Sequence, residues 1–396
     1  MRHKLKTGTA KTFAEYSEKV FIPHLKSYLA TTERLDIVWD QYLPNSLKAH
    51  TREKRGRARG IRRKVAAATK LPGNWQDFLR DDKNKHELFE FLSNTVSCHE
   101  YPEGKLVIIT AGEGVKSNFF HFNMSACSHE EADTRIMIHL LNAIELGSRK
   151  VNIRTVDSDV IIILIGKFFE IKDKIEDVCV TFGTGKNLVH YSIRRIYNEL
   201  GDSKSKAFLF FHAFTGCDTV SAFRGKGKKT ALSTWKAFRN ATKVFEQLSL
   251  NPFQLLDENS SEWDIIQRFV INMYIKSSPL TKVNDTRMEI FCKKNQSMEN
   301  LPPTEDALKQ HVKRSIFQAG IWSSSFIFKP IIPSPSLYGW KETEKVWKPD
   351  WITIPEVSES CRDLVKCGCS GDCQIRCKCK GANLPCSALC KCNCTT

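Results

Sequence analysis

Apolar positions recur along the chain with two different periods, one typical of helices and one typical of strands. Helical spacing of Tyr16, Val20, Phe21 and Leu25 predicts a helical segment within residues 1–30. The same period predicts helices at 75–92, 129–146, 188–200, 263–275 and 304–317. Each of these helices would have one apolar face and one polar face, as expected of helices that cover a common core.

Short runs rich in β-branched and aromatic residues lie between the helices that are predicted before residue 200. They predict strands at 34–40, 105–110, 151–155 and 178–182. The apolar run 159–165 fits a buried strand or a buried helix, and its periodicity does not decide between them. Strands that alternate with helices predict an α/β fold of three layers, in which helices cover both faces of a mainly parallel sheet.

The pattern divides the 396 residues into three regions. Residues 1–250 carry the alternating strands and helices, and residues 251–355 form a helical and irregular extension richer in Pro and aromatic residues. Residues 361–396 hold ten of the 15 cysteines. We therefore expect an α/β domain, an extension packed against it and a small Cys-rich domain.

Charge narrows the choice of partners. The chain has 60 Lys and Arg against 44 Asp and Glu, a net charge of +16, which favours a polyanion and most simply DNA. The apolar run Val160–Gly166 is far shorter than the roughly 20 residues of a membrane span. The basic start is not followed by an apolar stretch, so we expect no secretory signal there. A phosphate-binding loop for NTP is not found.

Carboxylates stand near the ends of several predicted strands and the starts of predicted helices. They are Asp40, Glu131, Asp133, Asp157, Asp159 and Asp218. The carboxyl ends of parallel strands meet at one edge of a sheet, so these side chains are expected to converge. Converging carboxylates repel one another unless a cation neutralises them, and their hard oxygen atoms suit two Mg²⁺ or Mn²⁺ ions that cleave a phosphodiester. The alternative for each acid is a surface charge or a residue at a helix N-terminus.

The order of these acids resembles the flap endonuclease branch of the PIN-like nucleases. That family carries an acid after an early strand, a Glu-Ala-acid pair, an Asp-x-Asp and a Gly-x-Asp. The same order occurs here at Asp40, 131–133, 157–159 and 216–218. The resemblance implies a PIN-like fold and a metal-dependent, structure-specific nuclease whose six acids bind the metal ions and the attacking water. The family's first strand and its Asp have no counterpart before Asp36, so the chain is expected to begin after that strand.

Two basic segments are the candidate nucleic-acid contacts of this domain. The resemblance implies a phosphate-binding turn after Asp218, with Gly225, Lys226, Gly227, Lys228 and Lys229. It also implies a helical arch in the basic window 51–70, where Arg52, Arg55 and Arg59 would share a helix face that Arg62 and Arg63 extend. The alternatives for this window are a solvated helix face and a nuclear localisation signal.

The cysteine tail is too short to bury an adequate apolar core and is predicted to fold around zinc. In a reducing compartment, clustered thiols favour metal ligation over disulfides. Nine of them resemble the tesmin-like CXC domain, a zinc-cluster module that binds DNA. They are Cys367, Cys369, Cys373, Cys377, Cys379, Cys386, Cys390, Cys392 and Cys394.

The resemblance implies about three zinc ions in the tail. Arg376 and Lys378 are its candidate DNA contacts. A zinc-stabilised knob without a DNA role, or a metal-buffering tail, is the alternative.

Together these features predict a nuclear, DNA-processing protein, in an arrangement typical of transposon-derived proteins. Two functions remain open from the sequence. The first is an active Mg²⁺- or Mn²⁺-dependent nuclease with a zinc-cluster tail. The second is a catalytically inactive protein that uses a degenerate nuclease fold to bind nucleic acid.

Overall fold

The computed structural model describes residues 6–42, 46–48, 61–294 and 300–352, together with separate residues of the tail between 367 and 392. The chain forms two compact units, Met1–Asp350 and Trp351–Thr396. Among the described residues, no helix combines the length and the apolarity needed to cross a membrane. The larger unit contains both of the three-stranded sheets, two large apolar cores and a small third cluster of Met124, Cys127 and Ile138.

The first core forms around a small mixed sheet. Strand β1 (Arg34–Ile37) pairs in parallel with β2 (Leu106–Ala111), and β3 (Gly114–Ser117) pairs with β2 in the antiparallel direction. Four helices contribute apolar side chains to the same core: α1 (Phe13–Tyr16), α2 (Ile22–Leu29), α4 (Trp75–Phe78) and α5 (Asp82–Ser97). A single π-helical turn, η1 (Ser17–Phe21), joins α1 to α2. The predicted helical start is therefore confirmed.

The helix predicted at 75–92 is two helices rather than one. Asp81 adopts an extended conformation, and its carboxylate accepts a hydrogen bond from the backbone N–H of Asn84 at 2.8 Å. This is an N-cap, which starts α5 as a new helix after α4. The apolar period continues across the break because both helices face the same core, which is why the pattern alone suggested one helix.

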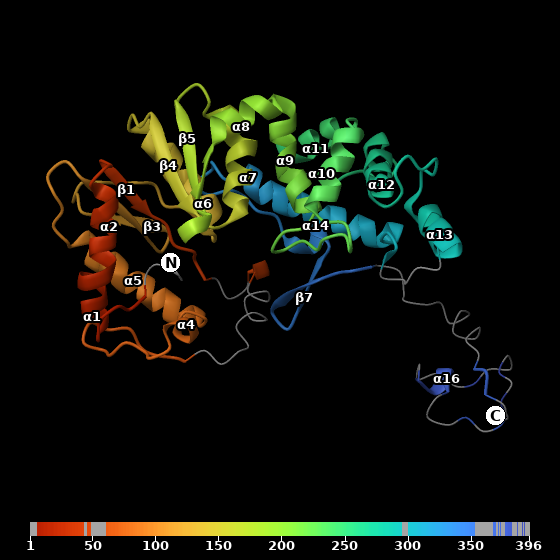
Figure 1. Ribbon diagram of the computed structural model, residues 1–396, viewed down its shortest axis with the longest axis horizontal. Helices are drawn as coiled ribbons and strands as arrows, with labels where there is room; N and C mark the ends of the chain where they lie inside the picture. Colours follow the sequence, from red (N-terminus) through yellow and green to blue (C-terminus); the bar gives the residue numbers. More distant parts are fainter. Residues whose placement is uncertain are drawn as a thin grey trace. The chain divides into compact units, whose positions relative to one another are not determined.

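The second core forms around another mixed sheet. Strand β4 (Lys150–Thr155) pairs in parallel with β5 (Asp177–Phe182), and β6 (Val189–Ser192) pairs with β5 in the antiparallel direction. Helices α6 (Ala132–Glu145), α7 (Ser158–Lys167), α8 (Ile193–Leu200) and α9 (Asp202–Phe214) pack around it (Figure 1). The apolar run 159–165 is thus a buried helix. The helix predicted at 188–200 is wrong for its first residues, which form β6.

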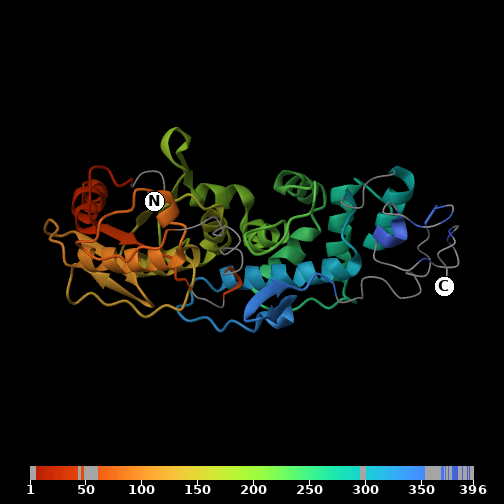
Figure 2. The ribbon, with the colours of Figure 1, turned by 90° about the horizontal axis from the view of Figure 1, so that it is seen from below.

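The segments after residue 227 extend this second core. They comprise α10 (Lys228–Ala237), α11 (Ala241–Leu250), α12 (Ser261–Tyr274), α13 (Val283–Lys294), α14 (Glu305–Ser323), β7 (Trp340–Thr343) and β8 (Val346–Pro349). The long helix α14 contacts α7, α9 and α11, and Figures 1 and 2 show it running beside α9. Trp263, Trp322 and Trp340 are buried in the same cluster as Val178 and Val180 of β5.

The described strands of the larger unit therefore give a mixed α/β fold with small sheets. The expected parallel pairing is present in β1–β2 and β4–β5, but each pair carries an antiparallel third strand in its own three-stranded sheet. β3 and β6 follow short connections after β2 and β5, and short connections favour antiparallel neighbours. Neither β3 nor β6 was predicted as a strand, since β3 has a single large apolar residue, Val115, and the helical period of 188–200 extends over β6.

Close packing of α7 on α9 gives the first testable prediction. A Cβ atom at Gly166 of α7 would lie 2.5 Å from Cγ of Leu209 in α9. We expect Gly166→Ala to lower the free energy of unfolding by about 1–3 kcal/mol, measured by urea denaturation, because overpacking displaces Leu209. Gly73→Ala is the control, since no atom lies within 4 Å of the added Cβ. A Gly166→Ala protein as stable as the control would contradict this packing.

Candidate functional site

The predicted acids come together at one cavity. Its volume is about 400 Å³, and the sequence-predicted residues that line it are Asp40, Glu131, Asp133, Asp157 and Asp218. They come from the segment after β1, the start of α6, the segment between β4 and α7, and the loop after α9. The sixth acid, Asp159, lies in the first turn of α7, and its charge acts on Asp133 and Asp157. Segments remote in sequence therefore form one acidic site, as the pattern predicted.

Two of these acids also cap helices whose N-termini face the cavity. The carboxylate of Asp40 accepts a hydrogen bond from the backbone N–H of Ala132 in α6, at 2.9 Å. The carboxylate of Asp157 accepts one from the N–H of Asp159 in α7, also at 2.9 Å. Helix N-termini carry partial positive charge and stabilise carboxylates. This structural role accounts for the positions of Asp40 and Asp157 without a metal ion.

Asp133 is different, because nothing in the described residues explains its second oxygen atom. The residue is 6% exposed, and its Oδ1 accepts the N–H of Thr134 at 2.7 Å. Its Oδ2 is buried and has no hydrogen-bond partner among the described residues. Burial raises the pKa of Asp133 to about 6, against the partial offset from Lys48. A buried oxygen atom without a partner, in a cavity lined by other carboxylates, suits coordination of a cation.

Lys48 supplies a positive charge inside this cavity. Its Nζ forms an ion pair with the carboxylate of Glu131, and the Lys48 side chain is 19% exposed. Burial disfavours the charged ammonium, but the carboxylates of Glu131, Asp133 and Asp218 outweigh that effect and raise the pKa of Lys48 above its ordinary value. Sequence reasoning missed Lys48, because a single Lys eight residues after Asp40 has no motif around it.

The loop that carries Asp218 depends on a glycine. Gly216 has a φ of 106°, and a Cβ atom there would lie 2.8 Å from the Cβ of Ala222. Only glycine adopts this conformation at low cost, and the close approach of Ala222 excludes a side chain. The Gly-x-Asp spacing noted in the sequence therefore has a backbone reason at this position, and it brings Asp218 to the edge of the cavity.

Asp159 is held by a histidine that the sequence did not indicate. Nε2 of His212, in α9, lies 3.0 Å from Oδ1 of Asp159, and both residues are more than 90% buried. Hydrogen bonding and the charge of His212 keep the pKa of Asp159 below its usual value, although burial opposes them. His212 came to light only from the structure, because α9 joins the site from 53 residues further along the chain.

A second buried polar group fixes β1 against α6. The carboxylate of Asp36 accepts two hydrogen bonds from Arg34, at 2.7 and 2.8 Å, and lies 2.7 Å from Nδ1 of His139 in α6. Arg34 also donates to Asn142 at 3.0 Å. These contacts join the strand that leads to Asp40 to the helix that begins beside Glu131. They hold the two parts of the acidic site in register.

The distances between the carboxylate oxygen atoms limit which ions the acidic site can bind in this arrangement. Among the described residues, no three of the acids bring their oxygen atoms within 4.8 Å of one another, whereas cysteines of the tail do. Lys48 occupies part of the space between them. A shared divalent ion would therefore need the carboxylates to move closer together and Lys48 to move aside.

The predicted basic contacts have mixed outcomes. Arg52, Arg55 and Arg59 lie outside the described residues. The guanidinium of Arg62 forms an ion pair with Glu87 of α5, and Arg63 donates to the carbonyl of Lys70 at 3.0 Å. Both side chains are therefore engaged with the protein itself. Arg80 and Lys85 line the cavity, where each pairs with an acid of the preceding turn, Asp77 at 2.8 Å and Asp82 at 2.7 Å. The Lys85 ammonium also lies 4.4 Å from the Tyr42 ring centre.

The turn after Asp218 also differs from the prediction. The ammonium group of Lys228 is turned toward the protein. Its Nζ donates to the carbonyl of His212 at 2.8 Å and to Oγ1 of Thr215 at 3.0 Å. Burial lowers the pKa of Lys228 to about 8. Nζ of Lys226 lies 5.1 Å from the ring centre of Tyr274. Gly225, Gly227 and Lys229 are exposed and remain available to a phosphate.

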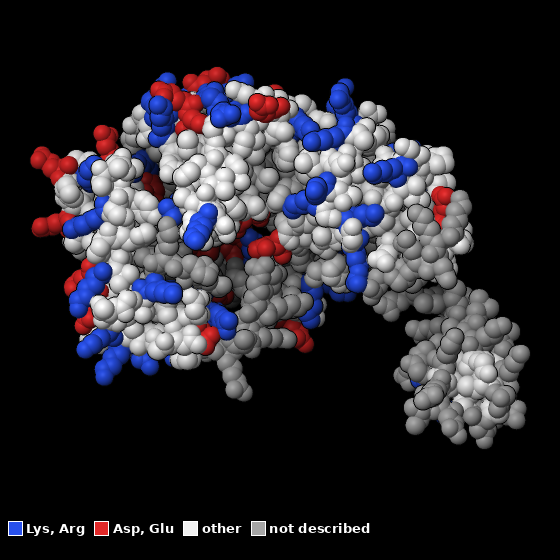
Figure 3. Space-filling model, viewed as in Figure 1, with Lys and Arg blue, Asp and Glu red and all other residues white. Residues whose placement is uncertain are grey.

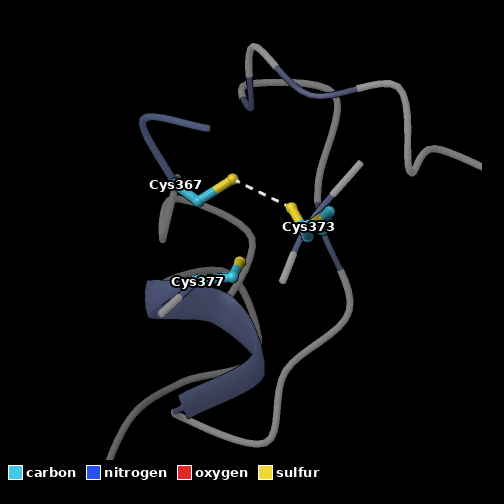
Figure 4. Close-up of side chains that lie close together, drawn as sticks. Cys367, Cys373 and Cys377 are labelled. Carbon is cyan, nitrogen blue, oxygen red and sulfur yellow. Dashed lines mark hydrogen bonds between the residues drawn. The ribbon is translucent and has the colours of Figure 1, made fainter. Parts of the chain in front are cut away.

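The tail holds a second candidate metal site. Two sets of four cysteines each place their sulfur atoms within 4.8 Å of one another. The sets are Cys367, Cys373, Cys377 and Cys386, and Cys367, Cys379, Cys386 and Cys390. Figure 4 shows the sulfur atoms of Cys367 and Cys373 turned toward each other, 3.6 Å apart, with Cys377 directly before α16 (Lys378–Gly381). Four thiolates around zinc are separated by about 3.8 Å, so this cluster fits a zinc-like ion.

Three cysteines of the predicted set belong to neither group of four: Cys369, Cys392 and Cys394. Cys392 lies 3.6 Å from Cys367 through their sulfur atoms, and Cys369 is half-buried but belongs to neither set of four. Cys394 and Arg376 lie outside the described residues, as does the side chain of Lys378. All described cysteines are free thiols. Cys367 and Cys386 belong to both sets, as expected where thiolates bridge neighbouring ions.

Comparisons with known proteins found no match for this chain. No family model matches the chain. No curated protein and no solved structure matches it either.

The raised pKa of Asp133 predicts the dependence of stability on pH. Its pKa is about 6 in the folded protein and 3.8 in the unfolded chain. Between about pH 4 and 6 the folded state retains the proton that the unfolded state loses, so this group contributes a stability that disappears as pH rises. Without divalent metal, we expect the gain in melting temperature of Asp133→Asn over wild type to be larger at pH 7.5 than at pH 4.5. A gain independent of pH would contradict an abnormal Asp133.

The shared cysteines predict the metal content of the tail. Native mass spectrometry should find about three zinc ions on the full chain at neutral pH. Cys386→Ser removes a thiolate common to both sets of four and should release more than one ion. Cys98→Ser is the control, because Cys98 is exposed and lies outside the tail. Retention of at most one zinc ion by the wild-type protein would refute a cluster.

Proposed function

We propose that this chain is a PIN-like, metal-dependent nuclease-like protein that acts on DNA, with a zinc-cluster tail that adds DNA affinity. The observation that carries the proposal is the gathering of five predicted carboxylates from four segments around one cavity, including the buried Oδ2 of Asp133, which has no hydrogen-bond partner among the described residues. Their order along the chain is the order that defines the family resemblance. Surface acids with only capping roles would not need a buried member.

The donor set fits hard divalent cations. Asp133, Glu131, Asp157 and Asp218 would hold Mg²⁺ or Mn²⁺, with Asp40 and Asp159 completing the negative field. Bound there, such an ion would activate water and stabilise the leaving oxygen of a phosphodiester. His212 fixes the orientation of Asp159, and the capped N-termini of α6 and α7 fix those of Asp40 and Asp157.

Lys48 has a defined part in this proposal. In the metal-free protein its ammonium neutralises Glu131 and reduces repulsion among the acids. If Glu131 held a divalent ion, Lys48 would no longer be needed to neutralise it, and its ammonium would be able to contact a negatively charged phosphate. The positive side chains of Arg80 and Lys85 on the cavity wall would hold further phosphates of the same strand.

The tail would act as a second binding module. Its six Lys and Arg against two Asp make residues 361–396 basic, and the zinc-like cluster would give them a fixed fold. Two linked modules that bind the same polymer raise overall affinity by effective concentration. This part of the proposal implies a nuclear protein that works on DNA.

An inactive DNA-binding protein is the second candidate. Lys48 stands among the carboxylates, and no three acids of the described chain lie close enough to share an ion in this arrangement. A protein that had lost catalysis would keep such a neutralised cavity as a structural feature. The two candidates differ only in whether divalent metal displaces Lys48 and supports cleavage.

Cleavage of a flapped DNA duplex in Mn²⁺ tests the nuclease. We expect Asp133→Asn to lower the cleavage rate by roughly 100-fold or more, because the loss of a metal ligand removes several kcal/mol of transition-state stabilisation. Asp264→Asn is the matched control, since Asp264 is an exposed acid in α12 that pairs with Lys282. The zinc-loaded full chain is used throughout.

The same assay separates the alternatives. Cleavage that survives in Asp133→Asn would come from another site or a contaminant and would exclude this cavity as its source. DNA binding without cleavage by the wild-type protein would leave the inactive DNA-binding protein as the function.

A further inference from the structure

A proline-rich segment between α14 and β7, residues 329–335, exposes apolar side chains. It reads Lys-Pro-Ile-Ile-Pro-Ser-Pro. Ile331 is 93% exposed and Ile332 is 46% exposed, and Leu337, which follows the segment, is 61% exposed. Large apolar side chains that are exposed this close together form a patch, which is typical of surfaces that bind another molecule.

The prolines restrict the backbone of this segment. Each of the three holds φ near −65° and disfavours the helical region for the residue before it. Six of the seven residues are therefore constrained, and Ile331 alone is not. Ser334 has a φ of −62° and a ψ of 132°, close to the values of about −75° and +145° that define the polyproline II helix. The segment thus has its extended conformation fixed before any partner binds.

The backbone of the segment is also unused by the protein itself. Within the part of the chain that the structure describes, residues 330–333 take part in no hydrogen bond. A polyproline II segment makes no internal hydrogen bonds, and its carbonyl groups remain open to water or to a partner. Both apolar side chains and backbone acceptors are therefore available on the same short segment.

The chain is anchored on either side of the segment. Before it, the carbonyl of Phe328 accepts the backbone N–H of Ser128 at 3.0 Å, and the Phe328 ring packs against the cluster of Met124, Cys127 and Ile138. After it, Tyr338 is 5% exposed and donates its hydroxyl to the carbonyl of Phe253 at 2.6 Å. Anchored ends reduce the conformational entropy that binding would cost.

The spacing of the prolines favours a groove over a sheet edge as the complementary surface. A segment that adds to a sheet edge must donate backbone N–H groups, and proline has none. A groove lined by aromatic rings needs no such donors, since it packs against the rings and apolar side chains of a polyproline II segment.

Charge adds a second requirement on the partner. The Lys329 side chain is 60% exposed, and its Nζ lies 3.6 Å from the carboxylate of Glu113, which is 61% exposed. Such an exposed ion pair is weak and easily exchanged for another. The chain carries a net charge of +16, and Figure 3 shows Lys and Arg side chains spread over the face that it displays. A groove with acidic side chains at its rim complements these charges.

We propose that residues 329–335 are recognised by a separate protein domain of the SH3 type, with a groove lined by aromatic rings and rimmed by acidic side chains. Ile331 and Ile332 supply the apolar contacts, and Lys329 pairs with the acidic rim. The interaction is independent of the nuclease function, because the described residues that line the acidic cavity do not include this segment.

Binding of an array of purified SH3 domains to the zinc-loaded full chain tests the interaction, with Kd measured by biolayer interferometry. At least one domain should bind saturably with a Kd below about 100 μM. The double variant Pro330→Ala, Pro333→Ala should weaken that binding by roughly 10-fold or more, because alanine restores freedom to the backbone. Pro102→Ala, Pro252→Ala is the matched control, since both prolines are exposed and lie in other parts of the larger unit.

A single substitution separates binding from folding. Because Ile331 is almost fully exposed, Ile331→Gln should leave the melting temperature at the wild-type value. It should weaken binding of the same domain by roughly 10-fold, since the partner no longer buries an isoleucine. Leu146→Gln, which replaces a leucine that is 61% exposed at the end of α6, should change neither quantity.

Three results would overturn the proposal. The first is an array in which no domain binds the wild-type chain. The second is a domain that binds the wild type and the Pro330→Ala, Pro333→Ala variant equally, because it then recognises another segment. The third is a wild-type dimer in sedimentation velocity that Ile331→Gln dissociates, which would assign the segment to contact between two copies of the chain. Neither DNA nor divalent metal enters these measurements, so loss of the nuclease proposal leaves this one intact.

Discussion

The carboxylates that line the cavity repel one another, and the surrounding structure has to offset that repulsion. The acids come from four separate segments of the chain. A helix N-terminus stabilises Asp40 and Asp157, His212 stabilises Asp159, and Lys48 stabilises Glu131. Asp133 is the member for which no described residue supplies full compensation. Neighbouring groups thus stabilise most of the negative charge. Oδ2 of Asp133 is the oxygen atom whose interaction with an added cation would be most favourable.

The two apolar cores explain why such a site forms at all. Asp40 follows the sheet of the first core, whereas Asp157 and Asp159 belong to the second. Helix α6 stands between them, joined to β1 through His139 and Asp36 and packed against α7. Polar groups with strict geometry, rather than apolar packing alone, set the register of this junction. The acidic cavity therefore depends on side chains that are distant in sequence, whereas the cysteine cluster of the tail is built from thiols that lie close together in sequence.

The sequence predicted the elements better than their arrangement. Periodicity found the helical start, the strands β2, β4 and β5, and the helices α12 and α14, because each has a long and regular apolar pattern. It failed for β6 and for the break before α5. Ser192 and Asp81 start new helices there, although the helical spacing of apolar residues continues across both positions. The convergence of the acids followed from their positions beside strands and helices. Lys48 and His212 could not be predicted, because tertiary contact alone brings them to their partners.

The bond from Ala132 to Asp40 has a consequence for how the larger unit responds to ligands. The N-terminus of α6 is closed by a residue some 90 positions earlier rather than by a cap of its own segment. Separation of the two cores would therefore uncap α6 and dismantle the cavity in a single event. By mass action, an ion bound in the cavity would also oppose that separation, so ion binding and the capping of α6 would be coupled.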